Sequence, residues 1–500
     1  MKINLKRFGA IAGFSFVSLI YFILRFTHLT IIPVFVDEAI YTHWSQIIRA
    51  DGAQSFIPLS DGKQPLFMWV GAFFMRFIKN PLVAERSVSV IAGFFTMFGL
   101  FLLMKKLFGQ RAALISSILY VLCPFMFFYD RLAVADGLLT AFFVYTALLS
   151  VYLAETLSLD KSLMLGWILG GGLLTKSTAG LSLISAPFSL LLVNWKGEGK
   201  LLKIVKFGAL MALSVAGGLL LYTILRLSPL YYLINQRTPD FIFTPKEVLK
   251  HPIDPFIFRF KGVGEWLAGY MTFPVIVLVV AGIGLMLKKN LRTALFLLAW
   301  FLIPLLIEME IAKGFTPRYF VFVAPIALTF PAFFIDQMLK VKKNIFPIVF
   351  AVLLVPAAIF EFQLLTNPQA APIPDKEKDG YLEQWSAGYG ILEISQFLRA
   401  QAQDGQPITV FTEGTQGYGT LPDGLQIYLR DVTNVTVSGV NWAIVKEVPK
   451  DLIEDAKTQR AYLVVNEDRL LDKGNPHLKL IMSYPKANGK DLLLFYQVTN

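Results

Sequence analysis

Blocks of apolar residues with almost no charges alternate with short basic stretches through the first 366 residues. A helix of about 20 apolar residues spans a hydrocarbon core of ~30 Å, and lipid offers the backbone no hydrogen-bond partners, so such blocks must be helical. The pattern therefore predicts a polytopic α-helical membrane protein. The blocks fall near residues 8–27, 65–79, 83–104, 111–129, 132–154, 161–175, 177–194, 203–226, 268–287, 291–312, 317–338 and 344–365.

Basic residues between the blocks predict the orientation of the spans, because Lys and Arg in short loops stay on the cytoplasmic side. They cluster near the N-terminus and at residues 105–111, 196–206, 288–292 and 340–343. All of these clusters share one side only if one early block does not cross. We therefore expect a multi-pass protein of the plasma membrane with its N-terminus in the cytoplasm. The first apolar run lacks a small-residue cleavage site, so we expect it to be a retained span rather than a signal peptide.

Block 65–79 is the best candidate for the block that does not cross, because it is short and begins at a proline. We expect it to form a helix at the outer surface of the membrane. About eleven crossings then remain, two of them short spans that meet at a hinge near Lys176. Long outer loops are expected at 28–82 and 227–265.

The composition of residues 367–500 predicts a soluble extracytoplasmic domain, separate from the membrane domain 1–366. They hold 13 Lys/Arg and 17 Asp/Glu, against 33 and 18 in residues 1–366. A helical pattern over 390–403 and four strand-like runs predict a small α/β domain, and the Gly-rich stretch 412–424 predicts a surface loop. The strand-like runs are 407–412, 461–466, 477–484 and 491–498. Asn434 begins an N-glycosylation triplet, a pattern that also arises by chance.

The composition narrows the possible functions. The net charge of +11 comes from the loops of the membrane domain, so it does not indicate nucleic-acid binding. Cys123, the only cysteine, lies in an apolar block, which excludes disulfides and Cys-based metal sites. The four histidines are scattered, which argues against a zinc site.

The first outer loop carries a pair of carboxylates, Asp37 and Glu38. Such a pair in a loop is often simply solvated. Here the apolar run Ile32–Val36 precedes it, and Tyr41 and Trp44 follow at helical spacing. The pair is therefore expected close to the membrane surface, where partial desolvation makes a carboxylate more basic and suits a general base.

Several ionisable residues are expected at the outer ends of the spans. Each cation alone is explained by a side chain that reaches the interface. Asp136 lies within an apolar run and needs a partner, for which Lys63 is a candidate. Several cations at the outer face run against the usual excess of Lys and Arg on the cytoplasmic side. A phosphate bound at the outer interface would explain them. The residues are Lys63, Arg131, Asp136, Lys176, Lys313, Arg318 and Tyr319.

The order of these motifs resembles the GT-C glycosyltransferases that use polyprenyl-phosphate sugars. The closest groups are protein O-mannosyltransferases and the bacterial aminoarabinose transferases that act on lipid A. The similarity covers about residues 8–330, and its specificity lies in the ordered set. The set is Asp-Glu in the first outer loop, DGKQP at 61–65, R-x-x-x-x-D-x-L-L from Arg131, L-L-T-K ending at Lys176, and R-Y-x-x-x-x-x-P from Arg318.

The resemblance implies roles for these residues. Asp37 would deprotonate the acceptor hydroxyl, with Glu38 assisting acceptor binding or positioning. Asp136 would hold a donor-binding lysine, with Lys176 in a supporting role. Gln64 departs from the family pattern, which has a proline there. The residues implied for binding the donor phosphate are Lys63, Arg131, Arg318 and Tyr319.

The expected activity is transfer of a hexose or pentose from polyprenyl phosphate to a protein, lipid or glycan hydroxyl on the outer face, with inversion. A monophosphate leaving group met by cations needs no metal or other cofactor, whereas a diphosphate donor would favour a divalent ion held by Asp37 and Glu38. A flippase for a lipid-linked glycan and a non-catalytic scaffold remain as alternatives. Neither an internal repeat nor a midplane cluster of charges, typical of transporters, is present in the sequence.

Overall fold

The computed structural model describes residues 5–499 except 198, 343, 345 and 416. The chain forms two compact units. The first comprises residues 1–27, 55–67 and 87–362, and the second comprises residues 28–54, 68–86 and 363–500. Parts of the first long loop thus belong to the same unit as the C-terminal domain.

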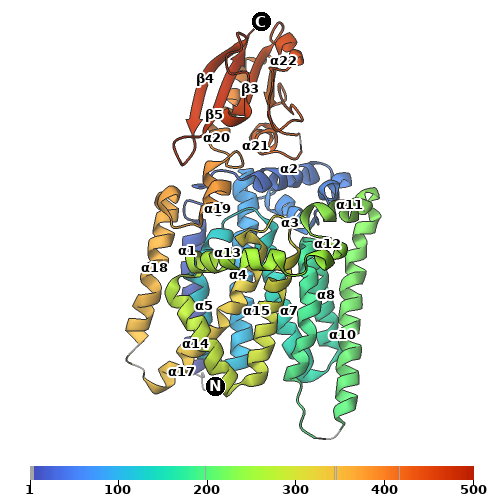
Figure 1. Ribbon diagram of the computed structural model, residues 1–500, viewed down its shortest axis with the longest axis vertical. Helices are drawn as coiled ribbons and strands as arrows, with labels where there is room; N and C mark the ends of the chain where they lie inside the picture. Colours follow the sequence, from blue (N-terminus) through green and yellow to red (C-terminus); the bar gives the residue numbers. More distant parts are fainter. Residues whose placement is uncertain (1–4, 198, 343, 345, 416, 500) are drawn as a thin grey trace. The chain divides into compact units, whose positions relative to one another are not determined.

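The first unit is helical throughout its described part (Figure 1). Its longer helices, two of which extend into the second unit, are α1 (Leu5–Phe26), α4 (Pro81–Phe108), α5 (Gln110–Val121), α7 (Ala135–Thr156), α8 (Leu159–Thr175), α10 (Lys200–Tyr222), α13 (Asp254–Met271), α14 (Phe273–Lys289), α15 (Leu291–Ile311), α17 (Thr329–Val341) and α18 (Phe346–Thr366). Its short helices are α6 (Pro124–Tyr129), α9 (Leu181–Ser185), α11 (Tyr232–Phe241), α12 (Pro245–Lys250) and α16 (Ala324–Ala327).

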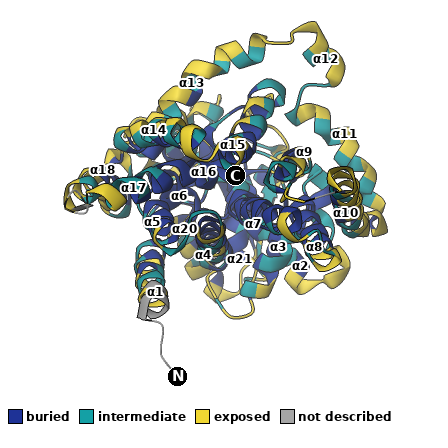
Figure 2. Ribbon diagram, turned by 90° about the horizontal axis from the view of Figure 1, so that it is seen from below, coloured by how far each residue is buried: buried dark blue, intermediate teal, exposed yellow. Residues whose placement is uncertain are grey.

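Six helical segments of the described chain are long and apolar enough to cross a membrane, and the bent pair α13–α14 makes up to seven. In α7, 78% of the most apolar window is buried, whereas the corresponding share is 22% in the segment that begins with α10. Figure 2 shows the same contrast between α7 and the exposed faces of α10 and α18. An apolar helix that exposes most of its surface is suited to contact with lipid. The chain is therefore a multi-pass membrane protein.

Breaks in the apolar segments are set by local backbone conformation. The predicted hinge at Lys176 is present: α8 ends at Thr175, Lys176 is extended (φ −162°, ψ 143°), and a 3₁₀ turn follows at Ser177–Gly180. The apolar block 111–129 is also divided, because α5 ends before Pro124 begins α6. Proline at a helix start has no amide hydrogen to continue the preceding helix.

Both segments predicted as long outer loops contain helices. Residues 227–265, expected as a long loop between spans, contain α11, α12 and most of α13, and α13 meets α14 at an angle of 109°. The first long loop contains α2 (Val36–Ala50) and the short helix α3 (Leu66–Phe74). Nine residues of helix are ~14 Å long, too short to cross a membrane. The prediction that block 65–79 does not cross therefore agrees with the length of α3.

The C-terminal part of the second unit is an α/β domain around a five-stranded sheet of order β2-β1-β3-β5-β4. Strand β1 is parallel to β2 and β3, and β5 is antiparallel to β3 and β4. All four predicted strands are present, whereas β2 was not predicted. The strands are β1 (Ile408–Thr412), β2 (Val435–Gly439), β3 (Arg460–Asn466), β4 (Leu478–Pro485) and β5 (Leu492–Val498).

Helices cover both faces of this sheet. The predicted helix is α20 (Ile391–Gln401), which shares a hydrophobic core with α21 (Thr420–Leu429) and with residues of β1 and β5. Leu452 of α22 (Lys450–Asp455) belongs to a second core that includes Leu463 of β3. The stretch 412–424 was expected to be a loop throughout, and this was wrong for its end, where α21 begins. The remaining helix of the domain is α19 (Asp375–Lys378).

The side chain of Asn434 is hydrogen-bonded to the backbone of its own domain. Its Nδ2 donates hydrogen bonds of 2.9 Å to the carbonyl oxygens of Ala402 and Gln406. A glycan on this nitrogen replaces one of its two hydrogens and therefore removes at least one of these bonds. The triplet that begins at Asn434 is therefore a structural feature of the β2 entrance rather than an open modification site.

Candidate functional site

A buried carboxylate with two cationic partners lies in the first unit. Asp136 is fully buried, and its Oδ1 accepts a hydrogen bond from Lys176 Nζ at 2.6 Å. Its Oδ2 accepts one from Arg318 Nε, also at 2.6 Å. Sequence analysis expected Lys63 as the partner of Asp136, but both carboxylate oxygens are instead paired with Lys176 and Arg318.

Three segments position this cluster. Asp136 occupies the first turn of α7, where the positive end of the helix dipole stabilises a carboxylate. Lys176 lies at the break after α8, and Arg318 lies in the 3₁₀ turn Pro317–Val323. The Lys176 and Arg318 side chains are 24% and 13% exposed, whereas that of Asp136 is 1% exposed. The buried carboxylate thus fixes two cations that reach toward solvent.

Neighbouring groups extend the cluster. Lys176 Nζ lies 5.3 Å from the centroid of the Tyr319 ring, so the predicted pair Arg318 and Tyr319 both contact this site. Glu308, buried near the end of α15, interacts with the hydroxyl of Thr178 and electrostatically with Lys176. Sequence analysis missed Glu308, although an acidic residue inside an apolar block is the signal that would have found it.

The predicted donor-binding residue Lys63 follows a tight turn. Gly62 adopts a left-handed conformation (φ 68°), which ends the 3₁₀ helix Ile57–Asp61. Lys63 Nζ lies 3.9 Å from Asp61 Oδ2 and 4.1 Å from the centroid of the Phe241 ring. Asp61 also pairs with Arg237 at 2.6 Å.

Gln64, the departure from the family pattern, has a defined contact. Its Nε2 donates to the hydroxyl of Ser177 at 3.2 Å. Ser177 directly follows Lys176, so this bond holds the segments that carry Lys63 and Lys176 against each other. An amide at position 64 thus provides a side-chain link that a proline lacks.

Arg131 occupies a different environment from the one expected. It is 1% exposed, and its Nη1 donates to the carbonyl oxygens of Leu24, Arg25 and Thr27 at 2.8–2.9 Å. These carbonyls lie at the end of α1, where the last helical carbonyls lack helical partners. The geometry supports a structural role for Arg131 in capping α1.

The acidic pair Asp37 and Glu38 lies in the first turn of helix α2, in the second unit. Glu38 is fully buried and forms a bidentate ion pair with Arg86 at 2.7 and 2.8 Å. Its carboxylate also accepts the Phe35 amide at 3.0 Å, as in a capping box. Asp37 is partly exposed on the same turn. Glu38 therefore holds the start of α2 in place, while its neighbour Asp37 reaches solvent.

Arg86 was not predicted, yet it organises this segment. Besides Glu38 it binds the carbonyl oxygens of Leu29, Ile32 and Pro33 at 2.7–3.1 Å. A single guanidinium thus satisfies the irregular backbone that precedes α2. The sequence signal was an arginine near the start of an apolar block.

A loop of the C-terminal domain also holds the chain before α2. The Val36 amide donates to Ser386 O at 3.1 Å, and the Gly388 amide donates to Val34 O at 2.8 Å. Lys486 Nζ donates to the carbonyl oxygens of Gln384 and Ala387 at 2.7 and 2.9 Å. Burial lowers the pKa of Lys486 to about 8. The position of Asp37 within the second unit therefore depends on contacts with residues 384–388.

Comparisons with known proteins agree with this architecture. Residues 62–244 match the family of dolichyl-phosphate-mannose-protein mannosyltransferases, and this segment contains Lys63, Asp136 and Lys176. No curated protein sequence matches the chain. Crystal structures of ArnT from Cupriavidus metallidurans, apo and bound to undecaprenyl phosphate, share its fold. The TM-scores are 0.58 and 0.59, at 15% and 16% identity, over 98% and 97% of both chains.

The chain therefore shares the fold of these ArnT structures. This confirms the resemblance expected from the sequence. The archaeal oligosaccharyltransferase AglB from Archaeoglobus fulgidus, in complex with an inhibitory peptide and a dolichol-phosphate, also shares this fold at 13% identity. Its TM-score is 0.52, over 93% of this chain and 70% of AglB.

Asp37 and Glu38 are the candidate metal ligands that the sequence offers. No group of three or more His, Cys, Asp or Glu side chains suited to a metal ion occurs among the residues that the structure describes. The two carboxylates offered by the sequence for a divalent ion differ in environment, since Glu38 is committed to Arg86. A metal held jointly by Asp37 and Glu38 would have to break that ion pair.

Proposed function

We propose that this protein transfers a sugar from a polyprenyl-phosphate donor to an acceptor hydroxyl on the extracytoplasmic face of the plasma membrane. The observation that carries the proposal is the Asp136 cluster, in which one buried carboxylate fixes Lys176 and Arg318. In this proposal the N-terminus is cytoplasmic and the C-terminal domain is extracytoplasmic.

The cluster suits recognition of a phosphate monoester. The Asp136 carboxylate places one oxygen on each cation, so Lys176 and Arg318 are held side by side, and both residue types bind phosphate oxygens. Fixed cations at a partly desolvated site stabilise the charge that develops on a leaving phosphate. Lys63, in the segment linked to Lys176 through Gln64 and Ser177, adds a third cation to this part of the first unit.

Asp37 is the proposed general base. It would take the proton of the acceptor hydroxyl as the oxygen attacks the anomeric carbon and the phosphate leaves, with inversion. Glu38 acts through its ion pair with Arg86, which fixes the turn that carries Asp37. A monophosphate leaving group met by cations requires no metal in this scheme. The sugar is a hexose or a pentose, and the acceptor is a protein, lipid or glycan.

The test is sugar transfer in membranes supplied with labelled polyprenyl-phosphate sugars. Asp37→Asn is expected to lower the rate about 10²–10⁴-fold, the range for loss of general-base catalysis. Arg318→Gln is expected to lower it about 10–100-fold through weaker phosphate binding. Lys261→Gln, which removes an exposed cation of α13, is the control and should keep the wild-type rate.

Two results would contradict the proposal. Wild-type transfer by Asp37→Asn would exclude this residue as the base. Movement of the labelled lipid across the membrane without transfer to any acceptor would favour a flippase instead.

A further inference from the structure

Two short segments of the second unit lie side by side directly before α2. Phe35 forms an isolated antiparallel bridge with Ala387. Its two neighbours, Val34 and Val36, form backbone hydrogen bonds with the same segment of the C-terminal domain. We call residues 384–388 the bracing segment. The proposed base follows Val36 directly in the chain, so these contacts hold the backbone from which α2 starts.

The two backbones approach each other closely at Gly388, whose amide donates to Val34 O at 2.8 Å. A Cβ built on Gly388 would lie 2.6 Å from Val34 O and 2.6 Å from Val34 Cγ1. Glycine allows this approach because it has no Cβ. The bracing segment is therefore fitted to residues 34–36, and a larger residue at position 388 would push the two segments apart.

Lys486 holds the bracing segment in turn. It follows β4 directly, in the turn that leads to β5, and it is 4% exposed. Its Nζ donates to Gln384 O at 2.7 Å and to Ala387 O at 2.9 Å. The adjacent Ala487 amide donates to Leu382 O at 3.1 Å. One buried amine thus ties the first and the fourth residue of the bracing segment to the sheet of the C-terminal domain.

Stability alone does not account for a lysine at this position. Burial lowers the pKa of Lys486 to about 8, against the opposing effect of Glu413, Asp468 and Asp491. Removing an amine from water costs free energy, and an apolar side chain in place of a buried charge is often neutral or stabilising. The hydrogen bonds that the amine forms within the described chain go to the bracing segment. The lysine therefore contributes a defined position of that segment more than it contributes stability.

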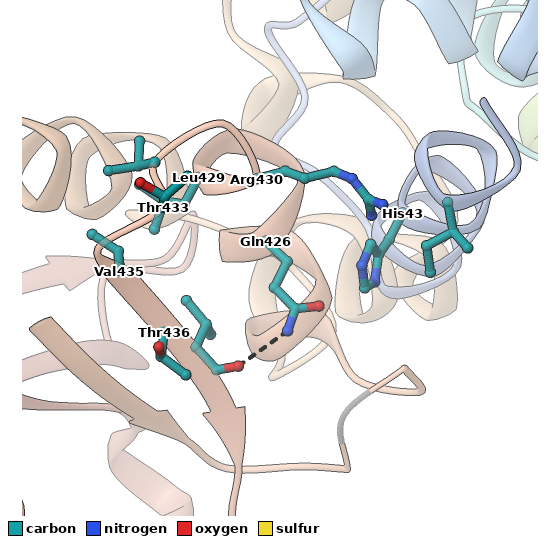
Figure 3. Close-up of a pocket in the computed structure, with 10 residues that line it drawn as sticks. His43, Gln426, Leu429, Arg430, Thr433, Val435 and Thr436 are labelled. Atoms are coloured by element: carbon teal, nitrogen blue, oxygen red, sulfur yellow. Dashed lines mark hydrogen bonds between the residues drawn. The ribbon is translucent and has the colours of Figure 1, made fainter. Parts of the chain in front are cut away.

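The body of α2 has a separate anchor. His43 Nδ1 lies 2.6 Å from Asp423 Oδ1, and Gln46 Nε2 donates to Ile427 O at 2.9 Å. Asp423 and Ile427 belong to α21, and Figure 3 shows His43 of α2 facing this helix. The bracing segment therefore contacts the chain where α2 begins, whereas α21 holds the later turns.

We propose that Lys486 is a positioning residue for the sugar-transfer reaction. Through the bracing segment it sets the place of Asp37, together with the ion pair of Glu38 and Arg86. A general base must lie within hydrogen-bond reach of the proton that it removes, and a displacement of about 1 Å can cost ~10²-fold in rate. The inference rests on the proposed function, because it gives the C-terminal domain a part in holding the proposed base.

The test combines transfer kinetics with hydrogen exchange on the full-length protein in nanodiscs. With a labelled polyprenyl-phosphate sugar, Lys486→Met is expected to lower kcat about 10–100-fold and to leave the KM for the donor unchanged. Amide exchange in residues 34–38 should become about tenfold faster or more, because two hydrogen bonds to a charged donor are lost. Exchange in residues 43–50 should stay at the wild-type rate.

Two further variants keep the test independent of the folding of Lys486→Met. Lys486→Arg retains a charged donor for both carbonyl oxygens, so most of the wild-type kcat should return. Gly388→Ala keeps the lysine but forces the bracing segment away from Val34, so it should lower kcat and speed exchange in residues 34–38. Unchanged kcat in both Lys486→Met and Gly388→Ala, or unchanged exchange in residues 34–38, would overturn the positioning role.

Two controls separate positioning from general loss of stability. Lys490→Met removes an exposed lysine from the same turn and should have no effect on either measurement. Leu452→Ala weakens the C-terminal domain through its second hydrophobic core, which does not include the bracing segment. It should lower the Tm without changing kcat or the exchange of residues 34–38. A fall in kcat equal to that of Lys486→Met at an equal loss of Tm would overturn the proposal.

The proposed function and the positioning role fail separately. If exchange in residues 34–38 responds as expected but the wild type transfers no sugar, the proposed function fails and the bracing of this turn stands. If Asp37→Asn abolishes transfer while Lys486→Met and Gly388→Ala keep the wild-type kcat, only the positioning role fails.

Discussion

At the residue scale, three buried carboxylates hold side chains from distant parts of the sequence in place. Asp136, Glu38 and Asp423 are each fully buried, and each has a cationic or imidazole partner. Removing such a charge from water costs several kcal/mol unless a partner and hydrogen bonds compensate for it. These carboxylates therefore fix the positions of their partners more than they add stability.

The first prediction concerns Asp136. Asp136→Asn replaces a carboxylate that pairs with Lys176 and Arg318 by a neutral amide with one acceptor oxygen. We expect the two cations to lose their fixed positions, with a fall in transfer rate of about 10–100-fold and a lower Tm. Asp160→Asn is the control, because Asp160 is solvent-exposed. A transfer rate and Tm unchanged by Asp136→Asn would show that the cluster has no role in catalysis.

The second prediction concerns Glu413, whose carboxylate accepts from the Asn466 amide at 2.8 Å and from Asn466 Nδ2 at 2.7 Å. Burial raises the pKa of Glu413 from 4.5 to about 7. Between these values the folded state binds more protons than the unfolded state, so stability falls as pH rises through this window. Glu413→Gln removes this titration.

We therefore expect the Tm difference between Glu413→Gln and wild type to shift in favour of the variant from about pH 5 to about pH 8. The corresponding change in the free energy of unfolding of the wild type relative to the variant is of order 1–3 kcal/mol, at about 1.4 kcal/mol per pKa unit. Melting curves of the full chain at several pH values measure it. Parallel pH dependence of the two proteins would contradict the assigned cause.

At the scale of elements, close contacts between helices depend on glycine. A Cβ built on Gly282 of α14 would collide with the carbonyl oxygen of Phe330 on α17, whereas one on Gly284 would meet nothing within 4 Å. Small residues let transmembrane helices approach closely, which is a main source of packing energy in lipid.

The third prediction uses this pair of glycines. Gly282→Leu is expected to separate α14 from α17 and to lower stability by about 2 kcal/mol or more, because backbone must shift to admit the side chain. Gly284→Leu should have little effect, since its side chain would point into open space. Thermal unfolding in detergent measures both variants, and equal Tm values would show that the α14–α17 contact is not required.

The sequence predicted elements well where a pattern was long and regular. The hinge at Lys176 follows from the positions of the basic clusters, and the four runs that became β1, β3, β4 and β5 follow from their apolar pattern. It failed for α13, α21 and β2, where polar or glycine-containing residues interrupt the pattern. Those elements form because partners are present: β2 pairs with β1, and α21 packs against the α20 core.

At the scale of the whole molecule, the distribution of basic residues predicts the orientation of the chain in the membrane. The fourth prediction starts from Cys123→Ala, which removes the single buried cysteine. Lys450→Cys in the C-terminal domain is expected to react with an impermeant maleimide on intact cells. Lys288→Cys, in a basic cluster, is expected to react only after permeabilisation. The reverse labelling would invert the proposed topology.

The sequence by itself determined that the chain crosses a membrane, where its charges cluster, and which residue types line the candidate site. These follow from local composition, because lipid and water select residues one segment at a time. Only the tertiary structure decided which side chains form ion pairs and hydrogen bonds with one another. Asp136 pairs with residues 40 and 182 positions away, and Arg131 donates to carbonyl oxygens at the end of α1. Such pairings depend on which segments fold together, and no local pattern records them.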